Sequence, residues 1–135
     1  MNLLGRTKIV PSIVPVVSSS ALTEVVIDCA GFDRVCHIIA TGEIASTGKL
    51  DYKVEESANS DGSSASAITG AALTQITDTG GSKIYAIDVP VNPAKPYQIA
   101  VGVAATANVA VSAVAVLYEG SGTFPKTAAT QAIIL

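Results

Sequence analysis

The stretch that decides the fold is PYQIAVGVAATANVAVSAVAVLYEG, residues 96–120, which carries no charged side chain between Tyr97 and Leu117. Its length would suffice for a membrane-spanning helix, since such a helix needs about 20 predominantly apolar residues. Polar residues interrupt the run, however, and its bulk comes from Val and Ala. Branched Val is stiff at χ1 and suits a pleated strand, so the composition of the stretch favours strands over a membrane helix.

The spacing of bulky residues in this stretch has a period of two. Tyr97, Ile99, Val101 and Val103 alternate with slim or polar neighbours, and the same alternation continues from residue 109 to residue 117. This is the period of a strand with two different faces. The small polar group ATAN, residues 105–108, separates the halves and suits a turn. We therefore expect a long β-hairpin in the middle of a sandwich.

The rest of the chain repeats short alternating segments separated by turn signals. In KLDYKVEE, residues 49–56, Leu50, Tyr52 and Val54 face one way and charged residues the other. Ser/Gly-rich or Pro-rich turns follow at residues 57–67, 77–82 and 92–96. The pattern predicts an all-β antiparallel sandwich of about seven to eight strands, jelly-roll or immunoglobulin-like. The other predicted segments are LTEVVID (22–28), DRVCHIIAT (33–41), AALTQI (71–76, a short strand or helical turn) and KIYAIDVPV (83–91).

The two ends of the chain differ from this central region, residues 21–120. Pro11 and Pro15 prevent a helix or an interior strand from running through residues 1–20, so this segment is predicted to be an extended N-terminal arm. It either reaches a partner or forms an edge strand of its own domain. Residues 121–135 are predicted to be a C-terminal tail, which begins Gly/Ser-rich and ends with apolar residues. The predicted partner-binding residues of arm and tail are Ile9, Val10, Ile13, Val14, Val16, Val17, Phe124, Ile133, Ile134 and Leu135.

Composition limits the possible partners. Charged residues make up 14% of the 135 residues, against about 25% in an ordinary soluble domain. A surface short of charge tends to associate unless it meets a partner. The net charge of −3 and the absence of a Lys/Arg cluster argue against direct nucleic-acid binding. The first 17 residues do not resemble a signal peptide, which indicates synthesis in the cytoplasm.

Few residues suggest catalysis or metal binding. His37 lies among apolar residues in its segment, so we expect a core or hydrogen-bonded histidine and not a catalytic base. Cys36 and His37 are adjacent on a strand and point to opposite faces, so they cannot join Cys29 in a zinc site. We predict no enzyme, no cofactor and no metal. Other sets also lack the required spacing: Asp61, Asp78 and Asp88 for calcium, Glu55 and Glu56 for a glycosidase pair, and GSGTFPK (120–126) for a phosphate loop.

Cys29 and Cys36 flank the bend Gly31-Phe32-Asp33. If that bend joins two paired strands, the thiols lie near each other across the ladder and a disulfide is geometrically conceivable. In a reducing cytoplasm, two buried free thiols are the better interpretation.

The order of these features resembles small β-sandwich structural proteins of tailed-bacteriophage virions. The most characteristic pieces are D-x-x-GFDRV, residues 28–35, and the Ala/Val stretch followed by a Gly-rich exit and Pro125. The likeness covers roughly residues 22–125. Within that group the chain is most similar to capsid decoration, or cement, proteins.

This resemblance implies a non-enzymatic protein on the capsid exterior, usually a trimer or other cyclic oligomer. Its arm and tail would bind the major capsid protein and hold the head together. The strand-like composition and period of residues 96–120, and not the resemblance, are what predict no membrane partner. A chain without residues 1–20 is then expected to fold but not to attach. Two alternatives stay open: a tail, connector or head-fibre component, and a carbohydrate- or surface-binding sandwich module.

Overall fold

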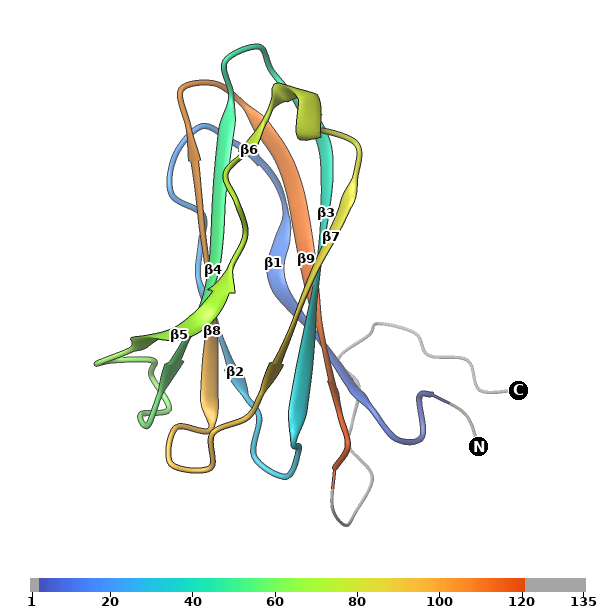
Figure 1. Ribbon diagram of the computed structural model, residues 1–135, viewed down its shortest axis with the longest axis vertical. Coiled ribbons are helices and arrows are strands. Elements are labelled where there is room, and N and C mark those ends of the chain that lie inside the picture. Colours follow the sequence, from blue (N-terminus) through green and yellow to red (C-terminus); the bar gives the residue numbers. More distant parts are fainter. Residues whose placement is uncertain (1–2, 121–135) are drawn as a thin grey trace.

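The computed structural model describes residues 3–120, which form two antiparallel β-sheets packed face to face (Figure 1). Sheet A has the strand order β1-β9-β3-β7, and sheet B has the order β2-β8-β4-β5, with β6 also paired to β4. The predicted all-β antiparallel sandwich is therefore confirmed. The elements are β1 Lys8–Ser18, β2 Val25–Asp28, β3 Arg34–Ile44, β4 Lys49–Ser57, β5 Ser66–Ala72, β6 Ile76–Thr77, the 3-10 helix η1 Asp78–Gly80, β7 Ile84–Pro90, β8 Tyr97–Ala105 and β9 Val109–Tyr118.

The connectivity distinguishes the two topologies that the sequence left open. Strands β5 and β6 behave as one interrupted strand, because both pair antiparallel with β4, through Ala72 opposite Lys53 and Ile76 opposite Leu50. Counted in this way, the strands lie in the orders 1-8-3-6 and 2-7-4-5. The chain thus changes sheet at nearly every connection. This is the order of an eight-stranded jelly roll.

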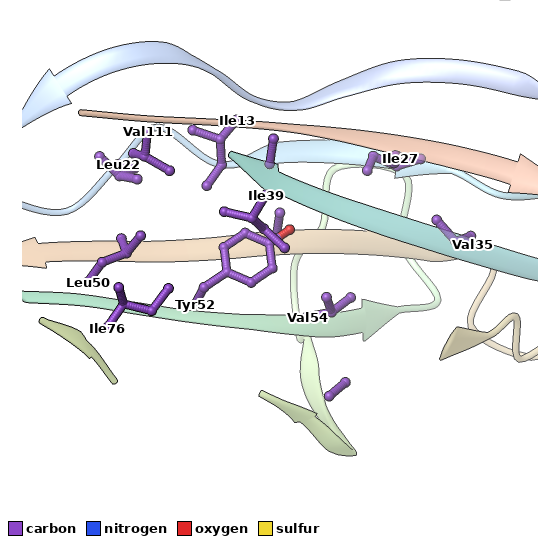
Figure 2. Packing of buried hydrophobic residues seen from close by; sticks show 14 of the residues in the cluster. Ile13, Leu22, Ile27, Val35, Ile39, Leu50, Tyr52, Val54, Ile76 and Val111 are labelled. Carbon is purple, nitrogen blue, oxygen red and sulfur yellow. The ribbon is translucent and has the colours of Figure 1, made fainter. Parts of the chain in front are cut away.

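The core lies between the sheets and is filled mainly by branched aliphatic side chains (Figure 2). Ile39 of β3 points toward Tyr52 of β4 across the gap, and both are almost fully buried. Burial of one such aliphatic side chain contributes about 1.5–3 kcal/mol. The inward residues predicted for β4, namely Leu50, Tyr52 and Val54, are all core residues.

The predicted hairpin of residues 97–117 is wrong in its pairing, although both halves are strands. β8 pairs with β2 and β4 in sheet B, whereas β9 pairs with β1 and β3 in sheet A. The turn between them, with Thr106 at φ 72°, carries the chain from one sheet to the other. Alternation shows that a segment is a strand but not which strand it pairs with, and this caused the error.

The described part of the chain, residues 3–120, contains no helix long and apolar enough to cross a membrane.

The bend after β2 is a crossover of the same kind. β2 belongs to sheet B and β3 to sheet A, so Cys29 and Cys36 do not face each other across a ladder. Both are free thiols: Cys29 is fully buried, and Cys36 lies half-buried on the outer side of sheet A. The interpretation as two unbridged thiols agrees with this arrangement, but only Cys29 is fully buried.

The prediction that residues 1–20 form an arm outside the sandwich is wrong for Lys8–Ser18. These residues are β1, which pairs with β9 along its length and places Ile13 in the core at 2% exposure. The alternative of an edge strand is therefore the one observed. Pro11 and Pro15 are accommodated because β1 has only one neighbour and its register shifts twice, between Pro11 and Ile13 and between Ile13 and Val16. The predicted tail, residues 121–135, lies outside the described residues.

Candidate interaction surface

The outer side of sheet A is apolar across its full width. Val114 of β9 lies opposite Pro11 of β1 on one side and opposite Ile38 of β3 on the other, and Ile38 in turn lies opposite Ala86 of β7. The rows next to this one are similar. We call the outward residues of these strands the uncharged face: Ile9, Pro11, Val14, Val17, Cys36, Ile38, Ala40, Gly42, Ile84, Ala86, Ala110, Ser112, Val114 and Val116.

Several large side chains of the uncharged face are open to solvent. Ile84 is 74% exposed, Val17 65% and Val14 60%, and Val114 in the middle of the face is 40% exposed. Single exposed apolar residues are normal on a soluble protein, whereas a contiguous apolar patch marks a surface that contacts another molecule. These residues are contiguous because the sheet register aligns them.

The uncharged face is hollowed at one end. An open depression of about 500 Å³ lies over small residues of β3 and β9, with Pro15, Val16 and Val17 of β1 along its rim. The small side chains are required there, because a Cβ on Gly42 would lie 3.0 Å from the Cβ of Ala110. The face thus offers both projecting and hollow apolar areas, as shape-complementary packing requires.

A polar cluster closes the opposite end of the face. Arg34 Nη2 lies 2.9 Å from Asp88 Oδ1, and Arg34 Nε donates to the same oxygen and to the Tyr118 hydroxyl at 3.1 Å. Tyr118 donates its hydroxyl to Asp88, and this hydrogen bond raises the pKa of the Tyr118 phenol. The one cation and one anion of this cluster neutralise each other, so the cluster adds no net charge to the face.

The outer side of sheet B is different in character. Lys49, Asp51, Lys53 and Glu55 alternate outward along β4, and Lys53 Nζ lies 2.7 Å from Glu55 Oε1. These exposed charged side chains keep the outer side of sheet B hydrated, and an ion pair on a surface does not remove them from water. The charge-poor composition is therefore concentrated on one sheet, which identifies sheet A as the candidate interaction surface.

The residues predicted to bind a partner do not all lie on this surface. Val14, Val16 and Val17 are exposed and belong to the face or to the rim of its depression. Ile9 is half-buried at its border, and Val10 is half-buried against the core. Ile13 is a core residue, so its assignment to partner binding is wrong. Phe124, Ile133, Ile134 and Leu135 lie outside the described residues.

His37 is a buried structural residue, as predicted. Its Nε2 lies 2.9 Å from Oε1 of Gln98, its Nδ1 lies 3.4 Å from the Tyr52 hydroxyl, and its side chain has no contact with solvent. Burial lowers the pKa of His37, and the hydrogen bond with Gln98 acts in the opposite direction. Substrate could not reach this imidazole in the folded chain.

The candidate metal-ligand sets are dispersed. Cys36 lies on the outer side of sheet A and His37 on the inner side, as their adjacency on a strand predicted. Asp61 is in the loop after β4, Asp78 is in η1 and Asp88 is in β7. Residues 3–120 contain no group of three or more His, Cys, Asp or Glu side chains placed to hold a metal ion. Glu55 and Glu56 make separate contacts, with Lys53 at 2.7 Å and with Lys95 at 4.0 Å.

A polar hollow lies beside the loop after β4. It is lined by residues 58–61, Ser63 and Tyr97. Its polar side chains form hydrogen bonds to other residues of the same loop. Asn59 Nδ2 donates to the Ser63 carbonyl at 3.1 Å, and Asp61 Oδ1 accepts from the Ser63 N–H at 2.9 Å. These groups hold the loop in shape and are not directed at a ligand.

Sequence reasoning missed Ile38, Ile84 and Val114 as surface residues. The available signal was that the segments of β3, β7 and β9 carry apolar residues at both odd and even positions. Such a segment has two apolar faces, and one sandwich core can cover only one of them.

No protein-family model matches the chain, and no match is found among curated proteins.

Proposed function

We propose that this chain is a non-enzymatic virion structural protein, a capsid decoration or cement protein that binds the major capsid lattice from the outside and stabilises the head. The observation that carries the proposal is the uncharged face, an apolar outer side of sheet A that spans all four strands. The likeness of residues 22–125 to phage β-sandwich structural proteins supports the same function.

The uncharged face is large enough for a stable contact between subunits. Its strands are 7 to 11 residues long. With strands about 4.8 Å apart and a rise of about 3.3 Å per residue, four of them cover roughly 600 Å². A standard protein interface buries about 800 Å² per partner. The face would supply most of that area, and many identical copies on one shell would add avidity.

The jelly-roll fold does not select among the remaining functions, because it occurs in viral capsid proteins and in lectins alike. Carbohydrate-binding modules present exposed aromatic rings to sugars. Here Tyr52 is buried, and Tyr85, Tyr97, Tyr118 and Phe32 are all partly buried. The distribution of aromatic residues therefore favours a protein partner over a sugar.

Binding to shells made of the major capsid protein from the same phage tests the proposal. The test variant is Val114→Lys, in the middle of the uncharged face, and the matched control is Val103→Lys on the outer side of sheet B. Val114 is 40% exposed and Val103 39%, so both lysines remain solvated in the free chain. An unpaired charge buried on binding costs several kcal/mol. We expect Val114→Lys to bind at least about tenfold more weakly in co-sedimentation, and Val103→Lys to bind like the wild type. Equal binding by both variants, or no binding by the wild type, would contradict the proposal.

A further inference from the structure

Strand β7 forms one edge of sheet A and has a single strand neighbour, β3 (Figure 1). The hydrogen bonds at the two ends of this ladder run from Thr41 N to Lys83 O at 2.9 Å and from Val91 N to Asp33 O at 2.8 Å. Both fit the register of the ladder, in which Arg34 lies opposite Pro90 and Ala40 opposite Ile84.

These two bonds fix which backbone groups of β7 are used. In an antiparallel ladder the bonded residues alternate, so the odd-numbered residues of β7 bond to β3. The even-numbered residues Ile84, Ala86 and Asp88 then turn their N–H and C=O groups away from β3. Pro90, which has no N–H group, also falls in this outward set. No other strand of residues 3–120 pairs with this side of β7.

The opposite edge of the sheet is protected, whereas the β7 edge is not. β1 carries Pro11 and Pro15 and two register shifts, features that prevent another strand from pairing with an edge. β7 has a proline only at its last position, and its ladder with β3 has no shift. A regular, unprotected edge with apolar side chains is a site for strand addition.

The side chains along this edge are those of the uncharged face. Ile84 is 74% exposed and Ala86 is exposed beside it. On the inner side, Tyr85 and Ile87 are only partly buried and pack against the core, as does Ile68 of β5, the nearby edge strand of sheet B. A strand added next to β7 would therefore cover apolar side chains on the outer side and on the inner side of sheet A.

We propose that β7 pairs antiparallel with β7 of a second copy about a two-fold axis, joining the two copies of sheet A into one continuous sheet. With the axis at Tyr85, Ile84 lies opposite Ala86 of the second copy, and both residues are in the outward-bonding set. Ser82, the residue that Asp88 would face, lies outside β7 with φ 56° and donates its N–H to the Gly42 carbonyl, so Asp88 lies beyond the paired residues and no like charges meet. With the axis moved to Ala86, Ile84 would instead face the carboxylate of Asp88.

The self-complementary edge is what favours a second copy as the partner. One short segment, residues 84–86, centred on Tyr85, supplies outward donors, outward acceptors and uncharged opposing side chains in the same register. A two-fold axis matches each group with its own counterpart, as in isologous dimers. The seam would also make the uncharged faces of two copies continuous. The inference deepens the proposed function by naming the contact between copies.

Oligomeric mass in solution tests the inference without a capsid. Ala86→Pro removes the central outward N–H but no bond to β3, and Ala86→Thr keeps the N–H and suits a strand, so it is the matched control. By light scattering after gel filtration, we expect the wild type, Ala86→Thr and Val103→Lys to have twice the chain mass of 13.6 kDa. Ala86→Pro should have the mass of one chain, with an unchanged circular-dichroism spectrum.

A second variant guards against misfolding of the proline variant. Ile84→Lys changes a side chain that is already 74% exposed, so it should fold normally and weaken the dimer at least about tenfold. Amide exchange gives an independent result: the N–H groups of Ile84 and Ala86 should exchange more slowly as protein concentration rises.

Three results would overturn the inference. They are a wild type of single-chain mass at all concentrations, exchange at these amides that does not depend on concentration, and a dimer that survives in Ala86→Pro but dissociates in Val114→Lys. A monomer that binds capsid shells would overturn only this inference. A dimer that binds none would overturn only the proposed function.

Discussion

The imidazole of His37 and the side-chain amide of Gln98 join the two sheets across the core. His37 lies on β3 of sheet A and Gln98 on β8 of sheet B, with 2.9 Å between His37 Nε2 and Gln98 Oε1. Tyr52 of sheet B lies on the other side of the ring, its hydroxyl 3.4 Å from Nδ1. Since the Gln98 oxygen only accepts, the neutral ring carries its proton on Nε2, and Nδ1 accepts from Tyr52. This network is a buried polar contact between two largely apolar layers.

Replacing His37 with Leu should destabilise the sandwich. The variant leaves the carbonyl oxygen of Gln98, a residue 1% exposed, without a donor. An unsatisfied buried polar group costs about 1–3 kcal/mol. Urea denaturation should show this loss in the free energy of unfolding, and Gln98→Leu should show a similar one. The double variant should lose less than the sum of the two, and strictly additive losses would show that the two side chains do not interact.

Stability should fall on mild acidification because of His37. Burial lowers the pKa of this imidazole below its ordinary value of 6.5 in the folded chain. Below about pH 6.5 the unfolded chain therefore binds a proton that the folded chain does not. The free energy of unfolding then decreases by at most about 1.4 kcal/mol per pH unit until the folded pKa is reached.

Urea titrations at about pH 7 and about pH 5 measure this effect, with His37→Leu as the control. The wild type should be less stable at the lower pH, and the variant should show a smaller change. The same pH dependence in both proteins would assign it to other groups. Asp61, whose pKa is lowered by its hydrogen bonds with Ser63, acts only at a lower pH.

Alternation in the sequence was sufficient to predict β3 and β4 as strands and to predict which of their residues share a face. In β3 this alternation groups Val35, His37 and Ile39 on one face of the strand, and all three are buried. Side-chain period depends on local backbone geometry, which short segments encode. Pairing depends on distant parts of the chain, and for this reason the crossover at residues 105–108 was predicted as a hairpin turn, and the bend at residues 31–33 could not be told from one.

The candidate surface was only partly predictable for a related reason. Low charge in the whole chain indicated an associating surface, but not which sheet carries it. The prolines of β1 suggested a segment outside the domain, although the same residues are compatible with an edge strand that has register shifts. Ile84 and Val114 could not be assigned to the surface from the sequence, because an apolar residue in a strand does not show which of two faces the core covers.

The two cysteines should differ in reactivity in the folded protein. Burial raises the pKa of the Cys29 thiol to about 12, and a weaker effect of burial, followed by the nearby Asp88, raises the pKa of Cys36. Since the thiolate is the reactive form, both should react more slowly than an exposed cysteine, and Cys29 more slowly than Cys36. A thiol-specific chromogenic reagent at mild alkaline pH measures both rates. In denaturant without reductant, both cysteines should react at once as free thiols. Fewer than two reactive thiols per chain would indicate a disulfide between Cys29 and Cys36, which contradicts their placement in this fold.

Ile13 and Val14 provide a direct test of β1 as part of the sandwich. They are neighbours on one strand, but Ile13 is 2% exposed and Val14 is 60% exposed. Ile13 also packs near Gly102 of β8, where an added Cβ would lie 3.0 Å from Ile13 Cδ1. Ile13→Ala should therefore cost about 2–5 kcal/mol of unfolding free energy, the range for truncating a buried aliphatic residue. Val14→Ala should stay within about 0.5 kcal/mol of the wild type, as is usual on a surface.

The same reasoning changes the expectation for a chain without residues 1–20: it loses a core side chain and uncovers the edge of β9, so it should be largely unfolded in the same denaturation experiment. A truncated chain with wild-type stability, or equal losses in the two alanine variants, would mean that this segment is an arm after all.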